Sequence, residues 1–183
     1  MVIAAVILGL VALVGLWFVV TYNALVRRRN NCDNAWAQID VQLRRRYDLI
    51  PNLVETVKGY AAHERGVFEA VTNARAAAID AKGVGEQAQA ETGLTKALKS
   101  LFAVVENYPQ LKANENFLAL QEELTATEGR IAYARQFYNE VALALNNKIQ
   151  MVPSSIVAGM TGFKIRDYFE AEEASREPVN VRF

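Results

Sequence analysis

The sequence predicts an all-α protein in which a single N-terminal transmembrane helix continues into an antiparallel four-helix bundle of long helices. The first twenty residues carry no charged side chain, and only four prolines occur among 183 residues. Apolar residues then recur three and four positions apart, which is the period of one helix face. We therefore expect three parts, namely a transmembrane anchor over 1–26, a helical bundle over 27–160 and a C-terminal tail over 161–183.

The N-terminal segment has the length of a membrane span. Twenty helical residues extend about 30 Å, roughly the thickness of one hydrocarbon core. A cleaved signal peptide is the alternative, but it would carry a basic residue before the apolar run, and none is present. The residues expected at the membrane interface are an aromatic pair and a basic triplet: Trp17, Tyr22, Arg27, Arg28 and Arg29.

Basic residues follow the span and none precede it. The positive-inside rule then predicts a single-pass protein of the bacterial inner (cytoplasmic) membrane, with its N-terminus outside and its bundle in the cytoplasm. The basic triplet itself could bind anionic lipid, but three charges are fewer than a typical lipid-recognition cluster. We favour a topology signal.

The first bundle helix continues from the anchor. Pro51 interrupts its pattern, because proline lacks a backbone donor and clashes with the preceding turn. We expect a turn or kink near residues 48–51 and a second helix over 52–79. The apolar row of the first helix is Leu25, Cys32, Trp36, Ile39, Leu43, Tyr47 and Ile50.

The second half of the chain predicts a loop and two further helices. Residues 81–93 are polar and contain glycine, so we expect the longest internal loop there, with room for some helix within it. A third helix should end before Pro109, and Asn114 or Asn116 can cap the fourth. The fourth helix has the clearest row, with a spacing typical of long helices packed at shallow angles: Phe117, Leu120, Leu124, Thr127, Ile131, Ala134, Tyr138, Val141, Leu145 and, one heptad later, Val152.

Several blocks of the sequence resemble the LemA family over essentially the whole chain. These blocks are YNALVRRRN (22–30), AWAQIDVQLRRRYDLIPNLVETVKGYAAHE (35–64), NYPQLKANENFLALQEELTATEGRIAYARQFYN (107–139) and FKIRDYFEAEE (163–173). The resemblance implies one membrane helix and a cytoplasmic bundle of long helices, with no established catalytic activity or cofactor. Related proteins occur in magnetosome formation, which suggests a role in membrane organisation by association.

Composition argues against several classes of function. The formal net charge is zero, so the broad basic field of a nucleic-acid-binding protein is absent. One cysteine and one histidine give neither an internal disulfide nor a plausible zinc site. His63 and Glu64 begin a zinc-protease motif, but position 67 is valine where its second histidine would stand. We expect no metal and no cofactor.

The second basic triplet is the main candidate for a polar layer or a protein contact. Arg44 can pair with Asp40 one helical turn away. Arg46 borders the apolar row, so we favour an internal carboxylate partner over contact with a neighbouring chain. The candidate residues for this polar layer or contact are Arg44, Arg45, Arg46, Glu64 and Arg135.

Two further features have alternative interpretations. Cys32 lies on the apolar row, which favours a small buried residue over a palmitoylation site. The tail carries aromatic residues beside acidic ones, a composition suited to docking on its own bundle or on another chain. The candidate docking residues are Phe163, Tyr168 and Phe169.

From these observations we expect a non-enzymatic membrane-anchored scaffold that contacts lipid through its N-terminal helix and self-assembles into a homo-oligomer. Long helices with mixed charge, confined beside a membrane, favour assembly. An adaptor or regulator of a membrane protease, or of another membrane protein complex, is the alternative. A lipid-binding or small-molecule-binding bundle would need an apolar cavity, and a hydrolase would need carboxylates around a metal.

Overall fold

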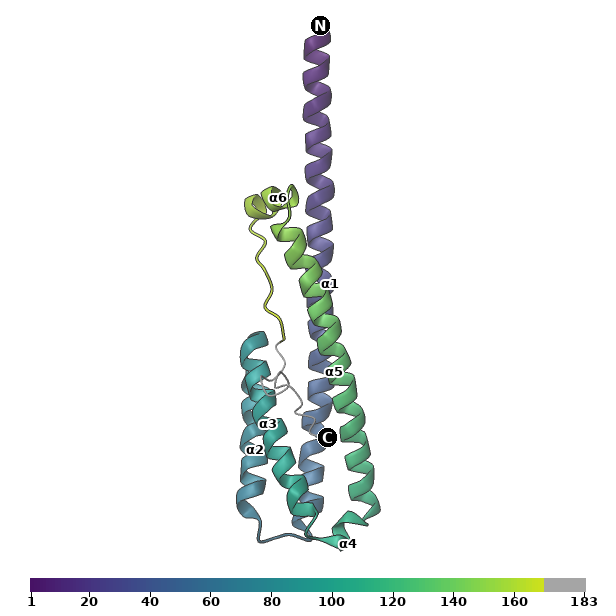
Figure 1. Cartoon of the computed structure of the whole chain (residues 1–183), viewed down its shortest axis with the longest axis vertical. Coiled ribbons are helices and arrows are strands. Elements are labelled where there is room, and N and C mark those ends of the chain that lie inside the picture. The colour runs from purple at the N-terminus through teal and green to yellow at the C-terminus, as the bar shows by residue number, and fades with distance from the viewer. Residues whose placement is uncertain (170–183) are drawn as a thin grey trace, which may run out of the picture. The chain divides into compact units, whose positions relative to one another are not determined.

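The computed structural model describes residues 1–169, and every regular element in that range is a helix (Figure 1). The all-α prediction is confirmed. The elements are α1 (Val2–Lys58), α2 (Arg65–Asp80), α3 (Gly83–Val105), α4 (Pro109–Lys112), α5 (Glu115–Gln150) and α6 (Ser154–Thr161).

The chain forms two compact units. Unit 1 contains Met1–Gln38 and Gln136–Asp167, and unit 2 contains Ile39–Arg135 together with Tyr168 and Phe169. The helices α1 and α5 each contribute one part to each unit. Unit 2 therefore consists of four main helical segments, from α1, α2, α3 and α5, with the short α4 before α5.

The core of unit 2 is built from one apolar row on each helix, as the helical period requires. Asn114 caps α5, because its side-chain oxygen accepts the backbone N–H of Phe117 at 3.0 Å. The rings of Phe102 and Phe117 meet edge to face with centroids 6.3 Å apart, within the range of about 4.5–7 Å typical of aromatic pairs. The buried apolar residues include Ile39, Leu43, Ile50, Leu53, Val57, Phe68, Val71, Leu94, Leu98, Leu101, Val105, Leu111, Phe117, Leu124 and Ile131.

The predicted turn at Pro51 and the second helix predicted over 52–79 are wrong, since α1 continues through this proline to Lys58 and α2 begins only at Arg65. Proline cannot donate to the carbonyl oxygen four residues back, which here belongs to Tyr47. Arg75 of α2 supplies the missing donor, because its Nε lies 2.7 Å from that oxygen. A side chain from a neighbouring helix thus satisfies the carbonyl that the proline leaves open.

The predicted loop over 81–93 is also wrong. The connection from α2 to α3 consists of Ala81 and Lys82, and α3 begins at Gly83. Gly83 adopts a positive φ of 80°, which glycine reaches without steric cost. Glu86 then accepts the backbone N–H of Lys82 at 3.0 Å and stabilises the start of the helix.

In unit 1, the first part of α1 is exposed and the part that follows it is packed. The side chains of α1 are exposed through most of its first twenty residues, and burial begins at Thr21 and Leu25. The stretch before them is long and apolar enough to cross a membrane, and none of it is buried. Val152 does not extend the row of α5, because α5 ends at Gln150 and the Val152 side chain is 81% exposed.

Candidate functional site

A buried polar cluster occupies the interior of unit 2. Its first member, Arg46, lies on the core-facing side of α1 beside Leu43 and Ile50, and only 1% of its side chain is exposed. A guanidinium loses most of its hydration in such a position, so it needs carboxylate and hydrogen-bond partners there.

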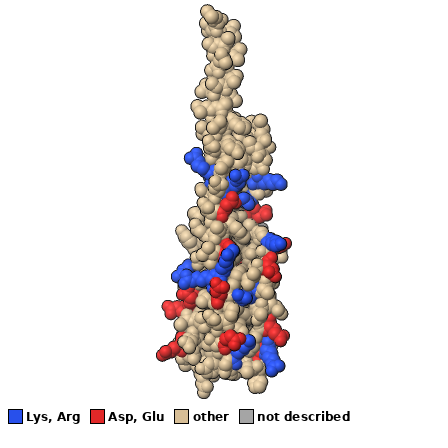
Figure 2. Space-filling model, turned by 180° about the vertical axis from the view of Figure 1, so that it is seen from behind, with Lys and Arg blue, Asp and Glu red and all other residues tan. Residues whose placement is uncertain are grey.

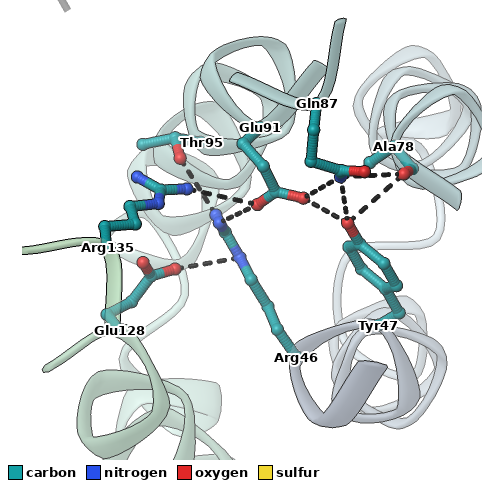
Figure 3. Close-up of polar contacts among 8 residues, drawn as sticks. All are labelled: Arg46, Tyr47, Ala78, Gln87, Glu91, Thr95, Glu128 and Arg135. Atoms are coloured by element: carbon teal, nitrogen blue, oxygen red, sulfur yellow. Dashed lines mark hydrogen bonds and ion pairs between the residues drawn. The ribbon is translucent and has the colours of Figure 1, made fainter. Parts of the chain in front are cut away.

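Glu91 of α3 is the centre of the cluster (Figure 3). Its Oε2 accepts from Nη1 of Arg46 at 2.7 Å and lies 3.8 Å from Nη2 of Arg135. Its Oε1 accepts from the hydroxyl of Tyr47 and from the Gln87 amide. Four polar groups therefore surround one carboxylate, which is as buried as the arginine it faces.

Tyr47 and Gln87 extend the cluster toward α2. The Gln87 amide nitrogen donates to the Tyr47 hydroxyl at 2.9 Å and to the carbonyl oxygen of Ala78 at 3.0 Å. Burial raises the pKa of Tyr47 well above its usual value, and the hydrogen bond to Glu91 raises it further. The phenol is therefore held protonated and acts as a donor.

Glu128 and Arg135 of α5 close the cluster at its outer side. Glu128 Oε1 lies 2.9 Å from Nε of Arg46, and the Glu128 side chain is 42% exposed. Burial lowers the pKa of Arg135, while Glu91 opposes that shift. Nη2 of Arg46 also donates to Thr95 at 3.0 Å. With two arginines and two glutamates, the charges of the cluster balance.

The arrangement joins four helical segments through polar contacts. Arg46 and Tyr47 belong to α1, Ala78 to α2, Glu91 to α3 and Glu128 to α5. Such a layer penalises slippage of any one helix, because a displaced helix would leave a charge buried without its partner. Among residues 1–169, no group of three or more His, Cys, Asp or Glu side chains could hold a metal ion.

A surface pocket of about 360 Å³ lies beside the cluster. Tyr47 and Gln87 line it and stand between the pocket and Glu91. The other lining residues include two acids and two arginines, so the pocket is not the apolar cavity expected of a lipid-binding bundle. These charged residues are Asp40, Arg44, Asp48 and Arg75.

The structure places the predicted polar residues in different surroundings. Arg46 and Arg135 come together around Glu91, whereas Arg44 pairs with Asp40 at 2.8 Å on the surface, as predicted for that pair. Arg45 pairs with Glu123 at 2.6 Å.

Glu64 does not belong to the cluster. It is half-buried immediately before α2, and its side chain makes no capping hydrogen bond there. The carboxylates that face Arg46 are those of Glu91 and Glu128.

The predicted tail residues divide between the two units. In unit 1, the Phe163 ring packs edge to face on Tyr22 with centroids 6.0 Å apart, and the Arg29 guanidinium lies 5.3 Å from its centroid. In unit 2, Phe169 is buried and the Arg135 guanidinium lies 4.3 Å from its ring centroid. Tyr168 stays 42% exposed. The remaining tail, 170–183, lies outside the described residues.

Polar contacts in unit 1 fix the segment that follows α6. Asn146 of α5 exchanges two hydrogen bonds with the backbone of Arg166, each 2.8 Å long. The Arg166 guanidinium pairs with Asp33 of α1 at 2.6 Å. Within unit 1, this segment therefore docks on its own chain.

The remaining residues predicted for the membrane interface also lie in unit 1. Arg27, Arg28 and Arg29 are exposed, and Arg28 donates to the carbonyl oxygen of Ala144 at 3.3 Å. Trp17 is half-buried. Cys32 is buried and its thiol lies 3.3 Å from the carbonyl oxygen of Val141, and burial raises the pKa of that thiol.

Gln87 and Glu91 were not predicted as site residues, because their segment was expected to be a loop. A signal was available, since they precede Leu94, Leu98 and Leu101 at alternating spacings of four and three. The two polar residues therefore begin the same helix row as the leucines. A polar start to an apolar row indicates a buried polar group with a partner on a facing helix.

The fold and the site define a helical-bundle protein with one helix suited to cross a membrane and a charge cluster paired internally. The chain belongs to the LemA family, whose family model matches residues 35–183.

The relatives include magnetosome proteins. Over an alignment of 184 residues, the chain is 28% identical to magnetosome protein MamQ 2 of Paramagnetospirillum magneticum, covering 86% of this chain and 68% of that protein. Magnetosome protein MamQ of Magnetospirillum gryphiswaldense is 27% identical over the same coverage. Protein LemA of Metamycoplasma hominis is 26% identical over 163 residues, with 87% and 73% covered. These names state no catalytic activity.

Proposed function

We propose that this protein is a non-enzymatic scaffold that is anchored in the bacterial inner membrane by its N-terminal helix and self-assembles through its bundle. In this proposal the N-terminus faces outward and the bundle lies in the cytoplasm, where it organises membrane or envelope components. The observation that carries the proposal is an exposed face of α5.

Lipid is the natural cover for the start of α1. Its uncharged stretch is exposed all round, and an apolar helix surface of this length is unfavourable in water. Arg27, Arg28 and Arg29 follow it on the side expected to face the cytoplasm. Similarity to magnetosome proteins supports a role at a membrane.

The polar cluster supports a structural role for the charged residues of the bundle. Glu91 is surrounded by donors from its own chain, and Arg46 by two carboxylates and a hydroxyl. A reactive group needs access to a substrate, whereas these two side chains are only 1% exposed.

An outward face of α5 provides a surface for a second copy. Leu118, Glu122, Ala126, Gly129 and Tyr133 follow one another at spacings of four and three, and each is exposed, so this face carries one charge, that of Glu122. Tyr133 is 73% exposed, which is unusual for a large aromatic side chain in a solvated helix. Small residues between larger ones allow a neighbouring helix to approach closely, so this face suits packing against another long helix.

The proposal is tested by measuring the mass of the full-length protein in lipid nanodiscs or mild detergent at several concentrations. We expect oligomers, and we expect Tyr133→Glu to shift them toward monomers by burying a charge in the contact. Gln89→Glu is a matched control, because it adds the same charge at an exposed position of α3, outside this face of α5.

A monomer at every concentration would contradict self-assembly. A stoichiometric complex with a different membrane protein, retained in mild detergent, would support the adaptor alternative. If both glutamate variants dissociate equally, the exposed face of α5 is not the contact between copies, and the proposed site of self-assembly is wrong.

A further inference from the structure

The short helix α6 and the residues before it expose apolar side chains in unit 1. Four of them are between 57% and 81% exposed, although α6 contains no charged residue that would favour exposure to water. These side chains belong to Met151, Val152, Ile156 and Met160. Single exposed apolar residues are common, but four in ten positions require an explanation.

The opposite side of α6 is packed. Ser154, Val157 and Ala158 are buried, whereas Ile156 and Met160, four residues apart, lie on the outward side, and Val152 is exposed just before the helix. The side chain of Ser154 bonds to the carbonyl oxygen of Lys148 at 2.7 Å, which ties the start of α6 to the end of α5. The orientation of α6 is thus fixed, and its apolar face is directed away from the protein.

The position of α6 coincides with the end of the uncharged stretch of α1. Phe163, two residues beyond α6, packs on Tyr22 and Arg29 of α1. Burial along α1 begins at Thr21 and Leu25, in the same part of the helix. The proposed membrane span ends there, so α6 lies at the level expected for the membrane interface.

The distribution of charge agrees with this level. Residues 149–163 carry no charge and lie between Lys148 and Lys164, while Arg27, Arg28 and Arg29 stand on α1 just beyond the span. On the face drawn in Figure 2, the end of unit 1 that carries the N-terminus shows only uncharged surface, down to a belt of Lys and Arg. Basic side chains at this depth would meet anionic lipid headgroups.

We propose that α6 is a second membrane contact, which lies in the bilayer interface and inserts Val152, Ile156 and Met160 among the lipids. The inference rests on the proposed membrane anchor. An apolar helix face typically enters the boundary of headgroups and acyl chains by about 5–10 Å. Since the segment after α6 is bound to α1 and α5, this contact would fix the rotation and tilt of unit 1 on the membrane.

The test uses spin labels on the full-length protein in vesicles of phosphatidylcholine and phosphatidylglycerol. The native thiol is first replaced, as Cys32→Ala, and single labels are placed by Ile156→Cys and Met160→Cys. Val41→Cys is the matched control, because Val41 is also exposed and apolar and lies on α1 well beyond the basic triplet Arg27, Arg28 and Arg29. Collisions with dissolved oxygen report lipid, and collisions with a water-soluble nickel complex report water.

We expect the ratio of oxygen to nickel collisions at 156 and 160 to exceed the ratio at 41 several-fold. Equal ratios at all three positions, with a fourth label at Leu10 reporting lipid, would overturn the α6 contact and leave the anchor intact. A Leu10 label that reports water would overturn the anchor itself. If the collision ratios at 156 and 160 differ, in variants whose circular dichroism matches that of the natural protein, the contact would also be overturned. Both residues lie on the same face of α6 and should report the same surroundings.

Discussion

The two ends of α1 differ in which side chains are exposed and which are buried. Over Val2–Val20 the helix is apolar and exposed. Over Ile39–Lys58 one face of the helix is buried, and the charged side chain of Arg46 is buried with it. Both stretches belong to one continuous helix. The backbone is the same in both, so the difference comes from what each surface can contact.

The comparison shows that side-chain exposure has meaning only together with the surrounding medium. An apolar surface without protein cover indicates lipid, because water would disfavour it. A charge without water indicates a partner, because unpaired burial costs several kcal/mol. In unit 2 that partner is present as Glu91, whereas in unit 1 the cover for α1 and α6 must come from outside the chain.

The largest expected effect follows from removing Glu91. Glu91→Ala would leave Arg46 buried, with the partly exposed Glu128 as its remaining carboxylate partner. We expect a loss of about 3–5 kcal/mol in the free energy of unfolding. Denaturant unfolding of the full-length protein in detergent, followed by circular dichroism, measures it. Glu69→Ala is the control, since Glu69 is exposed on α2 and should change stability little.

A double variant separates pairing from packing. Arg46→Met combined with Glu91→Leu removes both charges and keeps apolar volume, so stability should return close to that of the natural sequence or exceed it. If the double variant were as unstable as Glu91→Ala, the cluster would do more than pair two charges, and the contacts of Tyr47 and Gln87 would have to supply the difference.

The second effect concerns the exposed end of α1. Leu10 and Val41 are both apolar side chains of α1 and are 61% and 60% exposed. Leu10→Arg would place a charge near the centre of the span, which opposes insertion by about 2.5–3.5 kcal/mol. Val41→Arg places the same charge on the bundle, where we expect a change within about 0.5 kcal/mol.

The measurement is the fraction of the protein that stays with the membrane pellet after the membranes are washed with alkaline carbonate. Leu10→Arg should lower this fraction, and Val41→Arg should leave it unchanged. Equal retention of both variants would mean that exposure at position 10 does not report lipid, and the comparison between the two ends of α1 would no longer hold.

Sequence reasoning recovered the features that depend on local periodicity. The uncharged start of α1 and the row from Phe117 to Leu145 follow from composition and spacing. The features that it missed depend on contacts between helices. Nothing near Pro51 shows that Arg75 will bind the open carbonyl of Tyr47, so the helix was expected to turn.

Only part of the candidate site was predicted, again because contacts between helices cannot be read from a local pattern. Arg46 borders an apolar row, so a local pattern shows that it needs a partner. The identity of that partner depends on which residue of α3 lies opposite, and assigning 81–93 to a loop hid Glu91. The glycines of that segment were given more weight than the helix formers between them, although Gly83 alone has the positive φ there.

The smallest expected effect tests the substitute donor at Pro51. Arg75→Met would leave the carbonyl oxygen of Tyr47 without its 2.7 Å partner, and we expect a loss of about 1–3 kcal/mol. In a Pro51→Ala background, the new backbone N–H can bond to the same oxygen, so Arg75→Met should then cost less. Unfolding of the four proteins of this double-mutant cycle gives the coupling energy directly. Additive losses would show that Arg75 does not compensate for the proline, and the continuity of α1 through this position would need another cause.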